Sequence, residues 1–395
     1  KGNPSNWSQG DFDYNGVTNI FDMVQTNGAG VYGRGSYLPA APPSVNAVPE
    51  PATCVMALTG LVCGALSMWW RQLRARNCHL IPLTAAIAIA GAIEATPTSA
   101  QSVNYQLVPV GDPGNAPDTT GYGAVPYEYQ IGKYEVTIGQ YTDFLNAVAQ
   151  SDPYSLYNHN MTVDLRVAGI SRAGSSGSFT YSVINNGGNS SNRPVTWVTW
   201  FNAARFANWM HNGQGSGSTE TGAYTLNGAV IGEAPAKNSV ATFSIPTENE
   251  WYKAAYYSPM LNSGLGGYFM YATQSNSSPG NTIGSEANQA NHRSSPYGLF
   301  SVTQSSIYSL SQNYLTDVGA FTNSASYYGT FDQSGNVPEW NDLSGAGGSS
   351  FGVRGGGFYD GGFNLSSSPR AGGIYSGAYG LNGFRLASLV PGHAS

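Results

Sequence analysis

Cysteine occurs only near the beginning of this 395-residue chain, at Cys54, Cys63 and Cys78. The rest of the sequence must therefore fold without a disulfide bond, a thiolate metal site or a cysteine nucleophile. A chain of this length can bury a sizeable core in one or two domains without such cross-links. Hydrophobic residues make up 41% of the sequence and aromatic residues 12%, which excludes a disordered chain.

Charged side chains are scarce, because only 10% of the residues are Asp, Glu, Lys or Arg and the net charge is −6. The one concentration of basic side chains is formed by Arg71, Arg74 and Arg76. We expect no nucleic-acid partner, since phosphate backbones are bound by stripes of Lys and Arg. A surface that is polar through Asn, Ser, Thr, Tyr and Gly is more typical of an exported protein than of a cytosolic one.

Residues 1–47 form a first segment that ends in a linker rich in Pro and Ala. Its sequence DFDYNGVTNIFD, residues 11–22, has the spacing of a calcium-binding loop with a glycine at the sharp turn. The expected calcium ligands are Asp11, Asp13, Asn15, Asn19 and Asp22. Asp at the last position resembles the half-repeat of dockerin modules. The alternative is an acidic turn that binds nothing, because such loops usually occur in pairs.

The second segment, residues 48–78, joins a VPEP motif to an apolar run and an arginine cluster. The run covers residues 52–70, carries no charge and is long enough to span a membrane as a helix. The arginines that follow it are expected on the cytoplasmic side. This order resembles the PEP-CTERM sorting tail of bacterial surface proteins, which normally ends a protein.

The third segment, residues 79–100, is similar to a signal peptide, with a short apolar core and a small-residue cleavage site after Ala100. A sorting tail followed directly by a signal peptide is the pattern of two neighbouring reading frames joined into one. The alternative is a hairpin of two membrane spans whose short arginine loop faces the cytoplasm. Both interpretations place residues 101–395 outside the cytoplasm, at the cell surface, in the periplasm or in the outer envelope.

The main domain, residues 101–395, is predicted to be α+β with three helices. Two of these helices are expected near residues 138–149 and 247–257, because each follows a capping box. The third is expected near residues 199–212. Between them, aromatic or β-branched stretches alternate with Gly, Asn and Ser clusters, which is typical of short strands and long loops. The tryptophans expected in the core are Trp200, Trp251 and Trp340.

Six segments of the main domain occur in an order that resembles the formylglycine-generating enzyme family, also called sulfatase-modifying factors. They are IGKYEVTIGQYTDFLNAV (131–148), RPVTWVTWFNAARFANWM (193–210), SIPTENEWYKAAYY (244–257), YYGTFDQSGNVPEW (327–340), VRGGGF (353–358) and GFRLAS (383–388). The resemblance covers about residues 115–390. It implies a C-type-lectin-like fold, rich in loops and with little regular secondary structure.

The resemblance also implies a structural calcium ion at the loop SGNVPEW. The matching positions supply the side chains of Asn336 and Glu339 and the backbone carbonyls of Gly335 and Val337. Pro338 departs from the family, which usually has Trp here, and it removes an N–H group and an aromatic anchor. The alternative is a hydrogen-bonded turn without a metal.

The catalytic chemistry of the family does not carry over to this sequence. The resemblance implies that active members oxidise a substrate cysteine to formylglycine with oxygen, using two copper-binding cysteines after the RGG motif. The matching positions here are approximately Asp360 and Leu365. Because Cu(I) prefers thiolate ligands, whereas Asp is a hard ligand and Leu is none, we expect neither copper nor the oxidase reaction.

Residues 354–385 combine aromatic side chains with Gly, Ser and Asn, the mixture found in protein-binding loops. In this family the same region forms the groove that holds a ligand. The residues expected to line it are Phe358, Tyr359, Asp360, Phe363, Arg370, Tyr375 and Tyr379. The alternative is a tightly wound glycine loop in which the aromatic side chains serve as packing.

Three functions stay open on the sequence alone. The first is an exported, catalytically degenerate member that binds a peptide, a glycan or a cell-surface partner. The second is an active formylglycine-generating oxidoreductase that acts on sulfatases, which the missing cysteines oppose. The third is a structural component of the cell surface, which the sorting tail and the calcium loop favour. A membrane partner is expected only through residues 52–70, if they stay attached.

Overall fold

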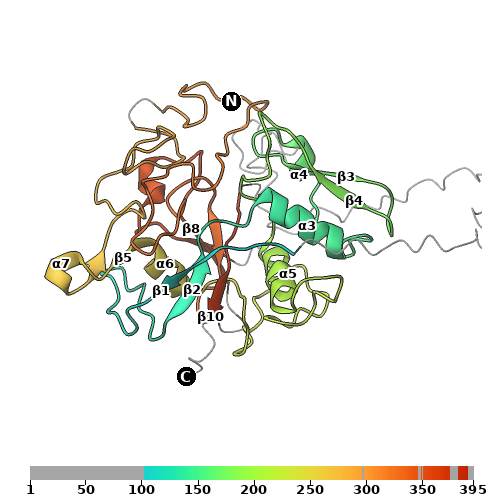
Figure 1. Cartoon of the computed structure of the whole chain (residues 1–395), viewed down its shortest axis with the longest axis horizontal. Coiled ribbons are helices and arrows are strands. Elements are labelled where there is room, and N and C mark those ends of the chain that lie inside the picture. Colours follow the sequence, from blue (N-terminus) through green and yellow to red (C-terminus); the bar gives the residue numbers. More distant parts are fainter. Residues whose placement is uncertain (1–101, 296–297, 346–347, 349, 374–380, 390–395) are drawn as a thin grey trace, which may run out of the picture. The chain divides into compact units, whose positions relative to one another are not determined.

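Figure 1 shows a computed structural model of the whole chain. The structure describes residues 102–295, 298–345, 348, 350–373 and 381–389. The chain divides into two units, residues 1–93 and 94–395, and all described residues belong to the second. The calcium loop, the apolar run and the signal-peptide-like segment predicted above lie outside the described residues, as do Tyr375 and Tyr379. In the described ranges, no helix is long and apolar enough to cross a membrane.

A three-stranded antiparallel sheet joins the two ends of the described domain. Its central strand β2 (Tyr129–Gly132) pairs with β1 (Leu107–Val110) on one side and with β10 (Ala387–Leu389) on the other. Tyr129 and Ile131 of β2 are buried, as expected for alternate positions on the inner face of a sheet. The last strand therefore lies beside one of the first.

A second antiparallel sheet leads into the region of the predicted groove. β8 (Phe351–Arg354) lies between β7 (Glu339–Asn341) and β9 (Ala371–Gly373). The long connection from β8 to β9, residues 355–370, therefore begins and ends at the same sheet and joins two neighbouring antiparallel strands.

Two short hairpins complete the strands. β3 (Ile170–Ala173) pairs with β4 (Thr180–Val183), and β5 (Tyr257–Ser258) pairs with β6 (Gly267–Tyr268). All the described strands have two to four residues, and long ordered loops connect them. This confirms the loop-rich α+β architecture predicted from the Gly, Asn and Ser clusters.

The three predicted helices are α3 (Ile138–Val148), α5 (Trp200–His211) and α6 (Glu248–Tyr256). α3 and α6 begin with the predicted capping boxes, in which the cap threonine and the third helical residue exchange hydrogen bonds. α5 begins at a threonine whose side chain accepts a hydrogen bond from the third helical N–H. The sequence did not predict the single-turn elements α4 (Asn160–Val163), α7 (Leu261–Gly264) and η2 (Gly362–Leu365).

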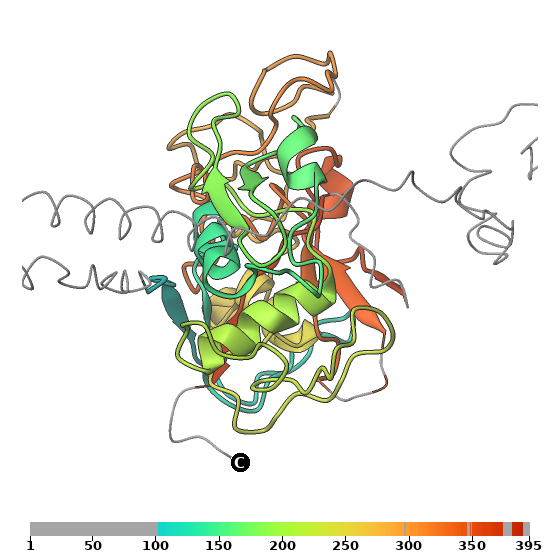
Figure 2. The same cartoon turned by 90° about the vertical axis from the view of Figure 1, so that its right-hand side faces the viewer.

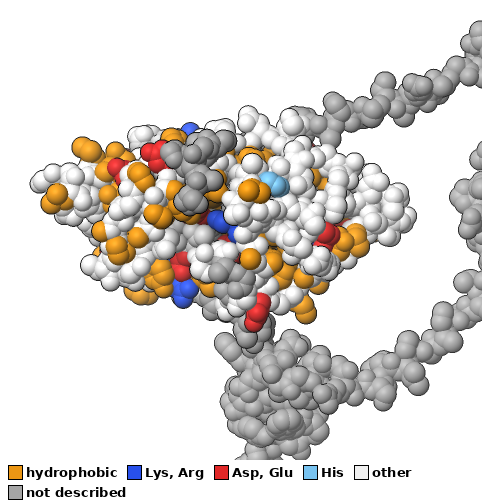
Figure 3. All heavy atoms as spheres, turned by 90° about the horizontal axis from the view of Figure 1, so that it is seen from below, with side chains coloured by type: hydrophobic (Ala, Val, Ile, Leu, Met, Phe, Trp, Pro, Cys, Tyr) orange, Lys and Arg blue, Asp and Glu red, His pale blue; other side chains and the backbone are white. Residues whose placement is uncertain are grey.

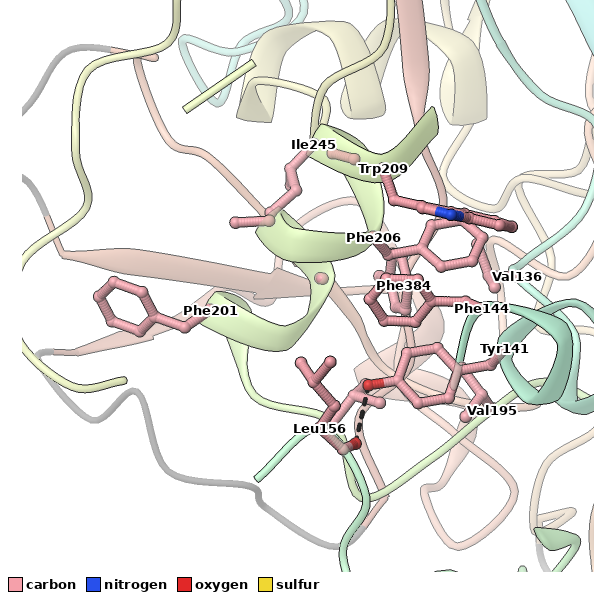
Figure 4. Packing of buried hydrophobic residues seen from close by; sticks show 14 of the residues in the cluster. Val136, Tyr141, Phe144, Leu156, Val195, Phe201, Phe206, Trp209, Ile245 and Phe384 are labelled. Carbon is pink, nitrogen blue, oxygen red and sulfur yellow. Dashed lines mark hydrogen bonds between the residues drawn. The ribbon is translucent and has the colours of Figure 1, made fainter. Parts of the chain in front are cut away.

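The largest hydrophobic cluster lies between α3 and α5 (Figure 4). Phe144 of α3 packs edge-on against Phe206 of α5 with 5.3 Å between ring centroids, and Phe384 from the GFRLAS segment contacts the same ring. On the other side of α5, Trp200 packs on Phe351 of β8 at 4.8 Å, and Figure 2 shows the two elements side by side. The prediction that Trp200, Trp251 and Trp340 are buried is confirmed.

α5 is buried on all sides, including its polar side chains. Arg205 pairs with Glu220 at 2.7 Å, and the Asn208 amide donates to the carbonyls of Thr219 and Tyr224. These contacts give partners to the Asn208 amide and to part of the Arg205 guanidinium, which would otherwise be expensive to bury, whereas Arg205 Nη1 has no acceptor. At the surface, charged side chains are few and scattered on the face drawn in Figure 3, in keeping with the low charged fraction of the sequence.

Candidate functional site

A glycine turn after β8 sets the direction of the predicted groove residues. Gly355 and Gly356 have φ of +97° and +64°, which side chains rarely adopt. A Cβ atom at Gly357 would lie 2.8 Å from Cδ of Pro338, so the turn also needs a close approach to the SGNVPEW loop. The turn therefore requires these glycines, and it presents the next three residues, Phe358 to Asp360, together.

The two positions that match the family cysteines hold the loop in place. The Asp360 carboxylate accepts hydrogen bonds from the Gly357 N–H at 2.9 Å and the Asn364 amide at 2.8 Å. Leu365 is fully buried against Tyr271 and Ala290. Asp360 thus stabilises the loop by hydrogen bonds, and Leu365 is part of the hydrophobic core.

The aromatic side chains of the turn divide between core and surface. Phe358 is buried and stacks on Tyr314, with 5.4 Å between centroids and 6° between the ring planes. Tyr359 is 47% exposed, and its ring lies edge-on to Tyr308 at 5.2 Å. Phe363 is 74% exposed. One of these three rings therefore packs in the core, and two are exposed at the surface.

A series of polar contacts connects Trp197 to the hydroxyl of Tyr308. Trp197 Nε1 donates to Asp164 Oδ2 at 3.1 Å. Asp164 pairs with Arg166 through two parallel hydrogen bonds of 2.7 Å, and Arg166 Nη1 donates to the Tyr308 hydroxyl at 2.8 Å. The hydrogen bonds that Arg166 donates to Asp164 raise the pKa of Arg166 further above its usual range. These hydrogen bonds hold the partly exposed guanidinium of Arg166 beside Tyr308.

Trp197 adopts a backbone conformation that is rare for a bulky residue. Its φ is +59°, in the left-handed region, and its side chain packs on the cluster that contains Phe358 and Tyr314. Such a conformation costs about 1–3 kcal/mol and persists only where the surroundings impose it. We define the Tyr359 face as Trp197, Asp164, Arg166, Tyr308 and Tyr359.

The residues of the Tyr359 face other than Tyr359 itself were missed by the sequence analysis. They come from three separate loops, and the tertiary structure alone brings them together. Exposed apolar side chains flank Tyr308 in the sequence, at Ile307 and Leu310. Apolar residues in this otherwise polar, Asn- and Ser-rich loop are the signal in the sequence that could have indicated the surface.

The predicted calcium ligands have other partners. Both carboxylate oxygens of Glu339 accept hydrogen bonds of 2.7 Å from Arg385, and one also accepts from Trp251 Nε1 at 2.9 Å. The Asn336 side-chain oxygen instead accepts from the Asn291 amide at 2.9 Å. A carboxylate that is occupied by N–H donors does not fit a calcium ligand. The described residues contain no group of three or more His, Cys, Asp or Glu that could hold a metal ion.

Arg370 does not join the turn residues by any hydrogen bond to them. Its Nε instead donates to both oxygens of Glu248, at the start of α6, at 2.7 and 3.0 Å. The predicted groove thus separates into the exposed residues around Tyr359 and a distinct arginine cluster at Glu248.

Comparison with known proteins identifies the family of this chain. Residues 119–389 match the model of the sulfatase-modifying factor enzyme 1-like domain. Among curated proteins, no match is found.

Solved structures that resemble the chain include that of CarF, with 18% identity, a TM-score of 0.44, and coverage of 73% of this chain and 100% of that one. Variable protein 1 of Treponema denticola has 16% identity, a TM-score of 0.40, and coverage of 74% and 98%. PvdO of Pseudomonas aeruginosa has 16% identity, a TM-score of 0.36, and coverage of 73% and 93%. Because the family model spans most of the sequence, the chain belongs to the sulfatase-modifying factor family and has the loop-rich, C-type-lectin-like α+β fold predicted for it.

Proposed function

We propose that this domain is an exported member of its family that has lost copper-dependent cysteine oxidation and binds a polypeptide on the Tyr359 face. One observation carries the proposal: half-exposed Tyr359 lies beside Tyr308 and next in sequence to Asp360, where active relatives carry a cysteine. Asp360, at the position that would hold the metal, caps its own loop by hydrogen bonds. The surface beside it carries the aromatic rings of Tyr359 and Tyr308.

The loss of the oxidase reaction follows from the chemistry of the side chains. Asp360 uses both carboxylate oxygens to hold its own loop, and Leu365 has no donor atom. Soft Cu(I) needs thiolate ligands, and no cysteine follows Cys78 in the sequence.

Peptide binding is supported by the composition and order of the Tyr359 face. Tyrosine and arginine are the side chains most often responsible for affinity at protein interfaces, because they combine a large contact area with hydrogen bonds. Arg166 is held by the two hydrogen bonds that it donates to Asp164, so little side-chain freedom is lost when a ligand binds. Its remaining donors suit the carbonyl groups of an extended peptide.

Selection from a random peptide library by the full-length protein tests the proposal. The best binder is then titrated against Tyr359→Ala and the matched control Tyr327→Ala. Tyr327 is 40% exposed and lies edge-on to Tyr328 at 5.2 Å, so both substitutions remove a similar ring. We expect Tyr359→Ala to weaken binding tenfold or more and Tyr327→Ala to change it less than twofold.

Two results would contradict the peptide proposal. One is an equal loss of affinity in both tyrosine variants, which would place the ligand elsewhere. The other is saturable binding on a glycan array by a protein that selects no peptide. Export is tested separately by mass spectrometry of the mature N-terminus, where we expect cleavage after Ala100. An N-terminus that retains residues 1–100 would show that this part of the proposal is wrong.

A further inference from the structure

A buried arginine at the end of β8 has a side-chain nitrogen without a hydrogen-bond acceptor. Arg354 is 3% exposed. Its Nε donates to Glu248 at 2.8 Å, and its Nη1 donates to the carbonyls of Ser367 and Pro369 at 2.9 and 3.1 Å. Its Nη2 is buried and has no acceptor. A buried cationic donor is rarely left in this condition, and it marks a place where an acceptor is missing.

A second arginine continues this cluster to the surface. The Arg370 side chain is 39% exposed, and only its Nε is used, by the two oxygens of Glu248. Its two terminal nitrogens donate to no described residue. The buried and the exposed guanidinium therefore both donate to a single carboxylate.

Both guanidinium groups also lie over the same aromatic ring. The central carbon of Arg354 is 4.7 Å from the Tyr122 ring centroid, and that of Arg370 is 5.6 Å from it. Arg354 contacts the Tyr252 ring as well, at 4.8 Å. The rings fix the guanidinium planes. The nitrogens left without a described acceptor are Nη2 of Arg354 and the two terminal nitrogens of Arg370. The nearby carboxylate of Asp118 is engaged by the hydroxyls of Tyr252 and Thr120.

We propose that Arg354, Arg370 and Tyr122 form a binding site for an oxyanion of the carboxylate or sulfate type. A planar guanidinium presents two parallel N–H groups, which match two oxygens of such an anion. Arg370 supplies these donors at the surface, and the buried Arg354, which shares Glu248 with it, adds a second positive charge. This site shares no residue with the Tyr359 face, so the inference stands independently of the proposed function.

Calorimetric titration of the full-length protein with sodium acetate and with sodium sulfate, at constant ionic strength, tests the site. We expect saturable binding of at least one anion and a loss of tenfold or more in Arg370→Gln. The matched control is Arg172→Gln, because Arg172 is also a partly exposed arginine that lies over two aromatic rings, those of Tyr157 and Phe179. The control is expected to bind within twofold of the unmodified protein.

A second variant tests the role of the shared carboxylate. Glu248→Gln removes the charge that neutralises the two arginines, so we expect it to bind the anion several-fold more tightly. Tighter acetate than sulfate binding identifies a carboxylate ligand, and the reverse identifies a sulfate or phosphate ester. The proposal is overturned if no anion shows saturable binding up to 50 mM, or if Arg370→Gln and Arg172→Gln behave alike while both remain folded by circular dichroism.

Discussion

Arg385 donates two hydrogen bonds of 2.7 Å to the two carboxylate oxygens of Glu339, and both side chains are fully buried. This pair connects the GFRLAS segment to the SGNVPEW loop. Arg385 also donates to the carbonyls of Gly132 and Phe331, each at 2.8 Å, so that one guanidinium joins β2 to two distant loops. The pair therefore holds the GFRLAS segment and the SGNVPEW loop beside β2.

Neutralising one partner of this pair is expected to destabilise the domain. In Glu339→Gln, the guanidinium of Arg385 remains buried beside a neutral amide, and breaking a buried pair costs about 3–5 kcal/mol. Urea denaturation measures the free energy of unfolding. The control is Glu128→Gln, at an exposed position, for which a change within about 0.5 kcal/mol is expected. A loss below about 1 kcal/mol in Glu339→Gln would show that the pair is not central to stability.

The stability of the domain should fall as the pH rises through neutrality because of Asp342. Burial raises the pKa of this carboxyl from 3.8 to about 7. The folded state therefore holds a proton that the unfolded state has released, so the stabilisation is present at low pH and is lost as the pH passes the folded-state pKa. Between pH 5 and 8 this loss amounts to about 2–3 kcal/mol.

The substitution Asp342→Asn removes this titration. Urea denaturation at pH 5, 6, 7 and 8 should show a smaller decline in the free energy of unfolding than in the unmodified protein. The comparison between the two proteins isolates Asp342 from Asp332, whose pKa is raised by burial to about 6 and which contributes in the same direction. Identical pH profiles of the two proteins would refute the assignment.

Arg166 should matter for ligand binding more than for stability. Arg166→Lys keeps the charge but loses the two parallel hydrogen bonds to Asp164 and the bond to Tyr308. We expect the affinity for the selected peptide to fall fivefold or more, while the free energy of unfolding changes by less than about 1 kcal/mol, since Arg166 is part-exposed. Arg172→Lys is the control. Equal affinities of the two variants for the peptide would show that Arg166 does not contribute to peptide binding.

The sequence predicted those parts of the fold that depend on local patterns. The capping boxes before α3 and α6 and the apolar face of α3 are short-range signals, and the helices begin within one residue of the expected positions. The strands have few residues and are held by partners far away in the chain, as β2 is by β10, so periodicity could not locate them.

The candidate site was only half predictable for the same reason. Tyr359 and Phe363 could be found because they follow a recognisable glycine turn. Trp197, Arg166 and Tyr308 meet through hydrogen bonds between loops, which leave no pattern in the sequence. Glu339 was predicted as a calcium ligand because its type and spacing suit one. In the structure it accepts hydrogen bonds from Arg385, which lies 46 residues further along the chain. Long-range charge pairing is the information that a single sequence lacks.

Incubation with Cu(I), oxygen and a cysteine-containing sulfatase peptide should give no aldehyde product. The family reaction needs two thiolates on one copper ion, and the matching positions, Asp360 and Leu365, are a loop cap and a core side chain. Mass spectrometry of the peptide detects formylglycine directly, and copper without protein provides the background. Formation of formylglycine above that background would contradict the proposal that the domain has lost the oxidase activity. The double substitution Asp360→Cys and Leu365→Cys should also fail to create the site, because it removes the hydrogen bonds that Asp360 makes to Gly357 and Asn364 and leaves a cavity at Leu365.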